Sequence, residues 1–82
     1  MKLEWAPYIS GPVNQLAVLR DKDRSWISMA RVMRNQFQVD EMYVQLANLP
    51  ARSGLVWKDK RYGSYTDLDT AKIAAEALVR LL

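Results

Sequence analysis

The C-terminal stretch from Leu68 to Leu82 constrains the fold more than any other segment, because its apolar side chains recur with the period of an α-helix. At about 100° per residue they fall on one face: Leu68, Ala71, Ala74, Ala75, Leu78, Val79, Leu81 and Leu82. The charged side chains gather opposite: Asp69, Lys72, Glu76 and Arg80. Thr66 and Asp67 are residues that cap a first helical turn. The pattern predicts an amphipathic helix over residues 67–82 that needs an apolar surface to cover.

Short segments rich in β-branched and aromatic residues precede this helix, and turn residues separate them. They are Leu3–Ile9, Asn14–Arg20, Trp26–Arg34, Met42–Leu49 and Leu55–Lys58. The first could instead be an irregular aromatic arm, and the last extends through Tyr62 in one interpretation. Asp40 could instead cap a short helix, so residues 40–49 are left open between strand and helix. The sequence predicts one α+β domain over residues 1–82, an antiparallel sheet of three to five strands packed by the C-terminal helix.

Composition excludes most catalytic chemistry. The 82 residues include no Cys and no His, which removes the thiol nucleophile, the commonest general base and the commonest metal ligand. Three pairs of carboxylates are close in sequence, and each has a structural explanation. Asp21 and Asp23 lie in a turn where acids are commonly solvated, and Asp67 and Asp69 lie at a helix start. Asp40 and Glu41 open a strand or helix and show no partner. We therefore expect a protein that is not an enzyme and binds no metal or cofactor.

Charge and hydropathy bear on the possible partners and on the cellular location. The net charge of +3 permits nucleic-acid binding without requiring it. No apolar run approaches the roughly 20 residues that span a bilayer, and the N-terminal residues lack the apolar core of a secretory signal. We expect a cytoplasmic protein without membrane association.

The third predicted strand suggests a contact surface. Its alternate residues form two sets: Trp26, Ser28, Ala30 and Val32 on one side, and Ile27, Met29, Arg31 and Met33 on the other. The sequence leaves open which set is buried, but a sheet with one helix leaves its second face for solvent or a partner. Flexible methionines beside Arg and Tyr suit an adaptable interface. The predicted partner-binding residues are Met29, Arg31, Met33, Arg34 and Tyr43.

Two alternatives accompany this hypothesis. Basic residues near aromatic ones could bind nucleic acid through phosphate contacts and base stacking, and they are Arg31, Arg34, Lys58, Lys60 and Arg61. The chain could also be a structural subunit that associates with itself, as a homodimer for example.

One segment carries a resemblance to a known class of proteins. A strand ends in a Gly and an aromatic residue, Gly63 and Tyr65, and a Leu-x-x-Ala-Lys-x-Ala-Ala-Glu run begins the helix at Leu68. With Ala30-Arg31-Val32 in a preceding strand, this pattern resembles small accessory proteins of phages and prophages. The order of strands and helix is also similar to plant and integrase domains that read DNA from a three-stranded sheet.

The phage resemblance implies a small, non-enzymatic protein that binds a host protein or nucleoprotein complex in the host cytoplasm. An inhibitor of host defence, such as an anti-CRISPR protein, is the kind of activity that this resemblance implies.

Overall fold

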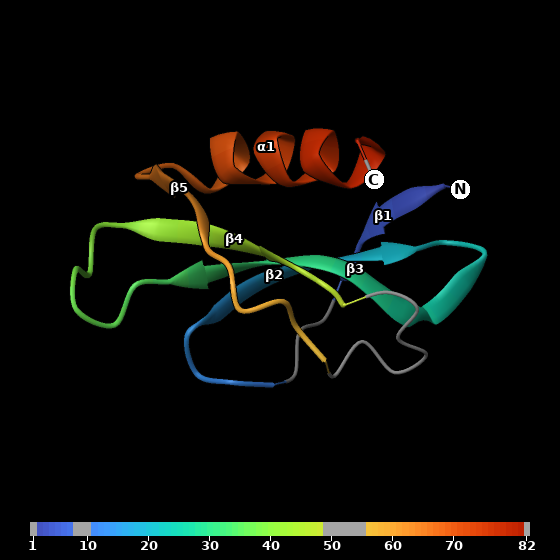
Figure 1. Cartoon of the computed structure of the whole chain (residues 1–82), viewed down its shortest axis with the longest axis horizontal. Coiled ribbons are helices and arrows are strands. Elements are labelled where there is room, and N and C mark those ends of the chain that lie inside the picture. Colours follow the sequence, from blue (N-terminus) through green and yellow to red (C-terminus); the bar gives the residue numbers. More distant parts are fainter. Residues whose placement is uncertain (1, 8–10, 49–55, 82) are drawn as a thin grey trace.

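A computed structural model describes residues 2–7, 11–48 and 56–81, and the side chains of Ser25 and Trp26 lie outside the description. In this part of the chain five strands form one antiparallel sheet, and one helix covers a face of it (Figure 1). The elements are β1 (Leu3–Trp5), β2 (Gln15–Asp21), β3 (Arg24–Arg34), β4 (Met42–Leu46), β5 (Tyr62–Tyr65) and α1 (Leu68–Arg80). Strand order in the sheet follows the sequence. The predicted α+β fold, with three to five antiparallel strands and a C-terminal helix, is confirmed.

Helix α1 begins at a cap formed by Asp67, as the sequence predicts. The Asp67 carboxylate accepts hydrogen bonds from the hydroxyl of Thr70 at 2.8 Å and from its backbone N–H at 3.0 Å. These two hydrogen bonds lower the pKa of Asp67. The helix ends at Arg80, and Leu81, predicted on the apolar face, is the C-cap residue and 83% exposed. Leu82 lies outside the described residues.

The main core lies between α1 and one face of the sheet. The helix contributes Ala71, Ala75 and Val79, whose small side chains let it approach the strands closely. Three strands contribute paired residues that share this face: Ala17, Leu19, Ala30, Val32, Val44 and Leu46. In β3 it is therefore the set containing Ala30 and Val32 that meets the helix.

The strand alternative for residues 40–49 is confirmed as far as β4 extends. Residues from Met42 to Leu46 pair with β3, from Arg34 back to Ala30. The predicted ends of the first and fourth strands, Ile9 and Leu49, lie outside the described residues.

The predicted position of the last strand, Leu55–Lys58, is wrong. Trp57 makes only an isolated bridge with Ala47, and Leu55 lies outside the described residues. The fifth strand is Tyr62–Tyr65, which the sequence suggested only as a strand end. It completes the sheet beside β4 and delivers the chain directly to the cap of α1 (Figure 1).

Strand β5 contains a position that requires glycine. Gly63 has φ of 76°, a conformation that residues with a side chain rarely adopt. A Cβ there would also overlap the ring of Tyr65, which packs against the main core. The aromatic ring thus occupies the space above the glycine.

Trp5 connects the first strand to the last helix. Its Nε1 donates a hydrogen bond to Oε1 of Glu76 at 2.8 Å, across 71 positions of sequence. Lys72 Nζ lies 5.3 Å from the centroid of the Trp5 ring, and Arg80 approaches the other Glu76 oxygen at 3.8 Å. Part of the charged side of α1 therefore holds β1 in place.

The turn between β2 and β3 contains a buried acid. Asp21 is only 1% exposed, although the sequence suggested a solvated residue. Its carboxylate accepts hydrogen bonds from the Asp23 N–H at 3.0 Å and from Arg24 Nε and Nη2 at 3.1 and 3.0 Å. Burial acts to raise the pKa of Asp21, but the hydrogen bonds from Arg24 and Asp23 outweigh it, so the pKa is lowered.

Candidate protein-contact site

The sheet face opposite α1, called the outer face below, is buried rather than free. Met33 and Tyr43 pair across β3 and β4 and are 7% and 8% exposed. Val18 of β2 is also buried, and it pairs with Arg31. Met29, which falls at a register shift between β2 and β3, instead belongs to the main core that includes α1. The expectation of a bare second face is therefore wrong.

The chain that follows β4 supplies the cover. Lys58 N–H donates to the carbonyl of Leu46 at 2.9 Å, and Trp57 forms an antiparallel bridge with Ala47. The guanidinium of Arg31 lies 4.3 Å from the centroid of the Trp57 ring. Arg31 Nε also donates to Oε1 of Gln45 at 3.0 Å, which fixes the guanidinium in place. Burial of Arg31 lowers its pKa below the ordinary value, while Tyr43 acts to raise it.

Of the five predicted partner-binding residues, the structure leaves one well exposed. Met29, Met33 and Tyr43 are buried, and Arg31 is half-buried against Trp57 and Gln45. Arg34 is exposed at the end of β3. These five side chains do not form an open surface, because the outer face is packed within the same chain.

Three of the five predicted nucleic-acid residues, Arg31, Lys60 and Arg61, are stacked on aromatic rings of the protein itself. Besides Arg31, Arg61 lies 4.5 Å from the ring centroid of Tyr43, and Lys60 lies 4.7 Å from that of Tyr62. Arg34, Lys60 and Arg61 are exposed, and Lys58 is half-buried. The rings of Trp57, Tyr43 and Tyr62 already carry a cation, so none of these three is free for base stacking, and the basic residues offer exposed charge alone.

A different exposed site lies at the loop between β3 and β4. Phe37 is 81% exposed and Val39 is 74% exposed. Three hydrogen bonds define the loop backbone: Asn35 N–H to Glu41 O at 2.8 Å, Glu41 N–H to Gln38 O at 3.0 Å, and Phe37 N–H to Asn35 Oδ1 at 2.8 Å. The two apolar side chains are thus held out into solvent by a hydrogen-bonded loop.

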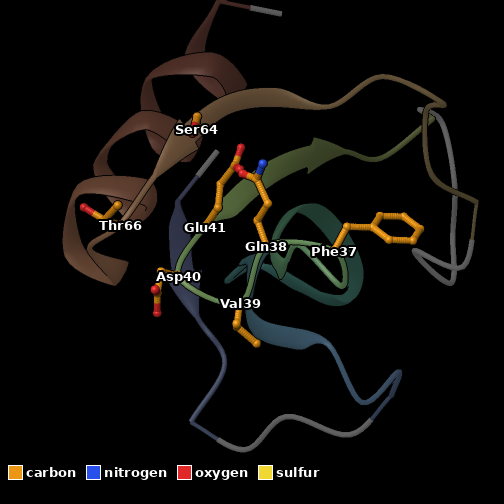
Figure 2. Close-up of a pocket in the computed structure, with 7 residues that line it drawn as sticks. All are labelled: Phe37, Gln38, Val39, Asp40, Glu41, Ser64 and Thr66. Atoms are coloured by element: carbon orange, nitrogen blue, oxygen red, sulfur yellow. The ribbon is translucent and has the colours of Figure 1, made fainter.

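An open depression of about 440 Å³ adjoins these side chains, and we call it the loop hollow. It is lined by Phe37, Gln38, Val39, Asp40, Glu41, Ser64 and Thr66. Figure 2 shows Gln38 and Glu41 pointing to the same side of the loop, whereas the Phe37 ring points away from both. Ser64 and Thr66 come from β5 and the entry to α1, so the hollow joins segments distant in sequence (Figure 2). The site therefore combines apolar rim residues with two carboxylates.

The sequence did not predict this site, because residues 35–41 fall between two predicted strands, where the sequence predicts turns. The available signal was the pair Phe37 and Val39, two large apolar residues inside that stretch. Phe37 and Val39 are exposed because the hairpin of β3 and β4 places them beyond the ends of both strands.

Comparisons with other proteins add no relative: no protein-family model matches the chain, and no curated protein or solved structure is significantly similar to it. Within the described residues, no three acidic side chains are grouped in a way that could hold a metal ion. In the same part of the chain, no helix is long and apolar enough to cross a membrane.

Proposed function

We propose that this protein acts by stoichiometric association with another protein, through Phe37 and Val39 of the β3–β4 loop. The observation that carries the proposal is that two large apolar side chains project from a hydrogen-bonded loop beside a hollow. Single exposed apolar residues are common on protein surfaces, but a pair beside a depression is typical of an interaction site. A loop that is already ordered also loses little conformational entropy when it binds.

The class of partner follows from the sequence resemblance. Small phage accessory proteins bind host machinery, so a host protein or nucleoprotein complex is the first class to test. Inhibition of a host defence complex would be one consequence of such binding. Inhibition by binding would need no catalytic side chain, in keeping with a chain that contains no His and no Cys.

Nucleic-acid binding receives less support from the structure. Exposed Arg34, Lys60 and Arg61 could contact phosphates, but the rings of Tyr43 and Tyr62 are already covered by cations. The remaining contribution would be electrostatic and independent of sequence.

The test compares partner capture by two variants. Immobilised wild-type protein and a Phe37→Ser/Val39→Ser variant are exposed to host-cell lysate, and each retained protein is quantified. Leu81→Ser is the matched control, since Leu81 is equally exposed but lies at the end of α1. We expect the double variant to lose a protein that the wild type and the control retain. Equal retention by all three would refute the role of the loop.

Self-association gives a different result in the same preparation. Sedimentation of the wild-type protein should yield the mass of a single chain at all concentrations. A mass that rises with concentration, and that Phe37→Ser/Val39→Ser abolishes, would identify the loop as a contact between copies of this chain instead.

A further inference from the structure

The loop between β3 and β4 contains two turns, and each displays one of the exposed apolar residues. The Phe37 N–H donates to Asn35 Oδ1 at 2.8 Å, so Phe37 ends a turn in which a side-chain oxygen replaces a backbone carbonyl. The Glu41 N–H donates to the Gln38 carbonyl at 3.0 Å, so Val39 lies at the first corner of a four-residue β-turn. The positions of both apolar side chains therefore depend on these turns.

The two apolar side chains extend from the loop in different directions, as Figure 2 shows for Phe37 and Val39. A partner that contacts both must match the angle between them, which the backbone of residues 35–41 determines. A loop that sampled other conformations would present this arrangement only part of the time. The apparent dissociation constant would then rise in inverse proportion to the fraction of time in the competent conformation.

Asn35 provides the one side-chain hydrogen bond of this loop in the described part of the chain. The other two bonds, from Asn35 N–H to Glu41 O and from Glu41 N–H to Gln38 O, join backbone groups and do not depend on side chains. Asn35 is half-buried and does not line the loop hollow, whereas Phe37 and Val39 do. A substitution of Asn35 can therefore change the order of the loop without altering the side chains that it displays.

We infer that Asn35 is a positioning residue for partner binding, and that its side chain sets the affinity by holding the turn from which Phe37 projects. The amide oxygen accepts from a backbone N–H two residues away, so the turn is stabilised in the free protein, before the partner arrives. Loss of one such hydrogen bond changes an equilibrium constant by about fivefold. The inference rests on the proposed function, because it concerns the same loop.

The free protein supplies the first readout. Heteronuclear NOE values of residues 36–40 and the exchange rate of the Phe37 amide, measured on ¹⁵N-labelled full-length protein, report the order of the loop. Asn35→Ala should lower these NOE values and speed the exchange of the Phe37 amide about fivefold, because the N–H loses its acceptor. Asn35→Asp, which retains an acceptor oxygen, should keep the wild-type values. Asn48→Ala is the matched control, since Asn48 is exposed and its side chain makes no hydrogen bond within the described residues.

Capture from host-cell lysate supplies the second readout. The probe is the protein that the wild type retains and that Phe37→Ser/Val39→Ser loses, titrated against each immobilised variant. We expect Asn35→Ala to bind it about fivefold more weakly, and Asn35→Asp and Asn48→Ala to bind it as the wild type does. A side chain that acted by direct contact would weaken capture without lowering the NOE values, whereas a positioning residue changes both.

Three results would overturn the inference: unchanged NOE values in Asn35→Ala, wild-type capture by Asn35→Ala although its NOE values fall, or an equal loss of capture with Asn48→Ala. In each case Phe37→Ser/Val39→Ser decides the proposed function separately. If that double variant retains every protein that the wild type retains, the proposed function fails, and the role of Asn35 fails with it.

Discussion

Met33 provides the sharpest test of the claim that both faces of the sheet are buried. If the outer face were a bare contact surface, truncating Met33 would leave stability unchanged. In the structure the residue is 7% exposed and pairs with Tyr43, whose ring is covered by Arg61. Met33→Ala should therefore destabilise the protein as a core substitution does.

The magnitude follows from the atoms removed. Alanine lacks the γ-carbon, the sulfur and the terminal methyl of methionine, and burial of each methylene-sized group contributes about 0.8 kcal/mol. The transfer contribution is then about 2 kcal/mol, and an unfilled cavity would add to it, within the roughly 2–5 kcal/mol seen for such truncations. For a domain of this size, each kcal/mol lowers the melting temperature by about 4–8 °C.

Urea unfolding followed by tryptophan fluorescence measures the effect. Val32→Ala, the neighbouring residue on the helix side, should cost about 1.5–2 kcal/mol by the same reasoning. Leu81→Ala is the exposed control and should stay within about 0.5 kcal/mol of wild type. A Met33→Ala variant as stable as Leu81→Ala, with Val32→Ala clearly destabilised, would show that only one face is packed.

Three further predictions test local features of the fold. Because the folded-state pKa of Asp21 is lowered, its carboxylate should stabilise the protein fully above pH about 4 and lose that effect as pH falls through the folded-state pKa. Urea midpoints measured from pH 6 downwards should thus decline more steeply for the wild type than for Asp21→Asn, and identical profiles would contradict this. Gly63→Ala should cost at least about 1–2 kcal/mol, because φ is positive and the Cβ overlaps Tyr65; an unchanged melting temperature would be inconsistent with that geometry. Trp5→Phe should lose about 1 kcal/mol through its hydrogen bond to Glu76, and combining it with Glu76→Ala in a double-mutant cycle should show coupling, which independent residues would lack.

The elements that the sequence predicted well are those determined by local interactions. Helix α1 follows from apolar residues at helical spacing and from Asp67, which caps the helix three residues before its hydrogen-bond donor Thr70. The pairing of β2 with β3 and of β3 with β4 follows from their short connections, residues 22–23 and 35–41, which favour pairing of neighbours. The helix cap and the short strand connections are therefore both local in sequence.

The elements that the sequence did not predict depend on distant contacts. In β3, Ala30 and Val32 alternate with Met29 and Met33, so both sides are apolar and periodicity cannot select the helix side. The cover on the outer face depends on the stacking of Arg31 on Trp57, and nothing near Trp57 indicates it. For the same reason the methionines were interpreted as contact residues.

The candidate site was missed for a related reason. Large apolar residues such as Phe37 are informative only when it is known that the core is complete without them. The sequence alone does not say whether a loop residue folds back onto the sheet, and only the structure shows that Phe37 is exposed. The acids Asp40 and Glu41 were noticed in the sequence, but no partner or pocket could be assigned to them.

The contact between Trp5 and Glu76 has a consequence for biosynthesis. Since α1 comes last in the described chain, a nascent chain emerging from the ribosome would have its strands available before the segment that covers them. Until α1 is released, the apolar side of the sheet, including Leu19, Val32 and Leu46, would lack its cover. Such a partly synthesised chain would expose apolar surface to chaperones and be prone to aggregation. Once formed, α1 would cover this surface and would also hold β1 through the hydrogen bond from Trp5 to Glu76.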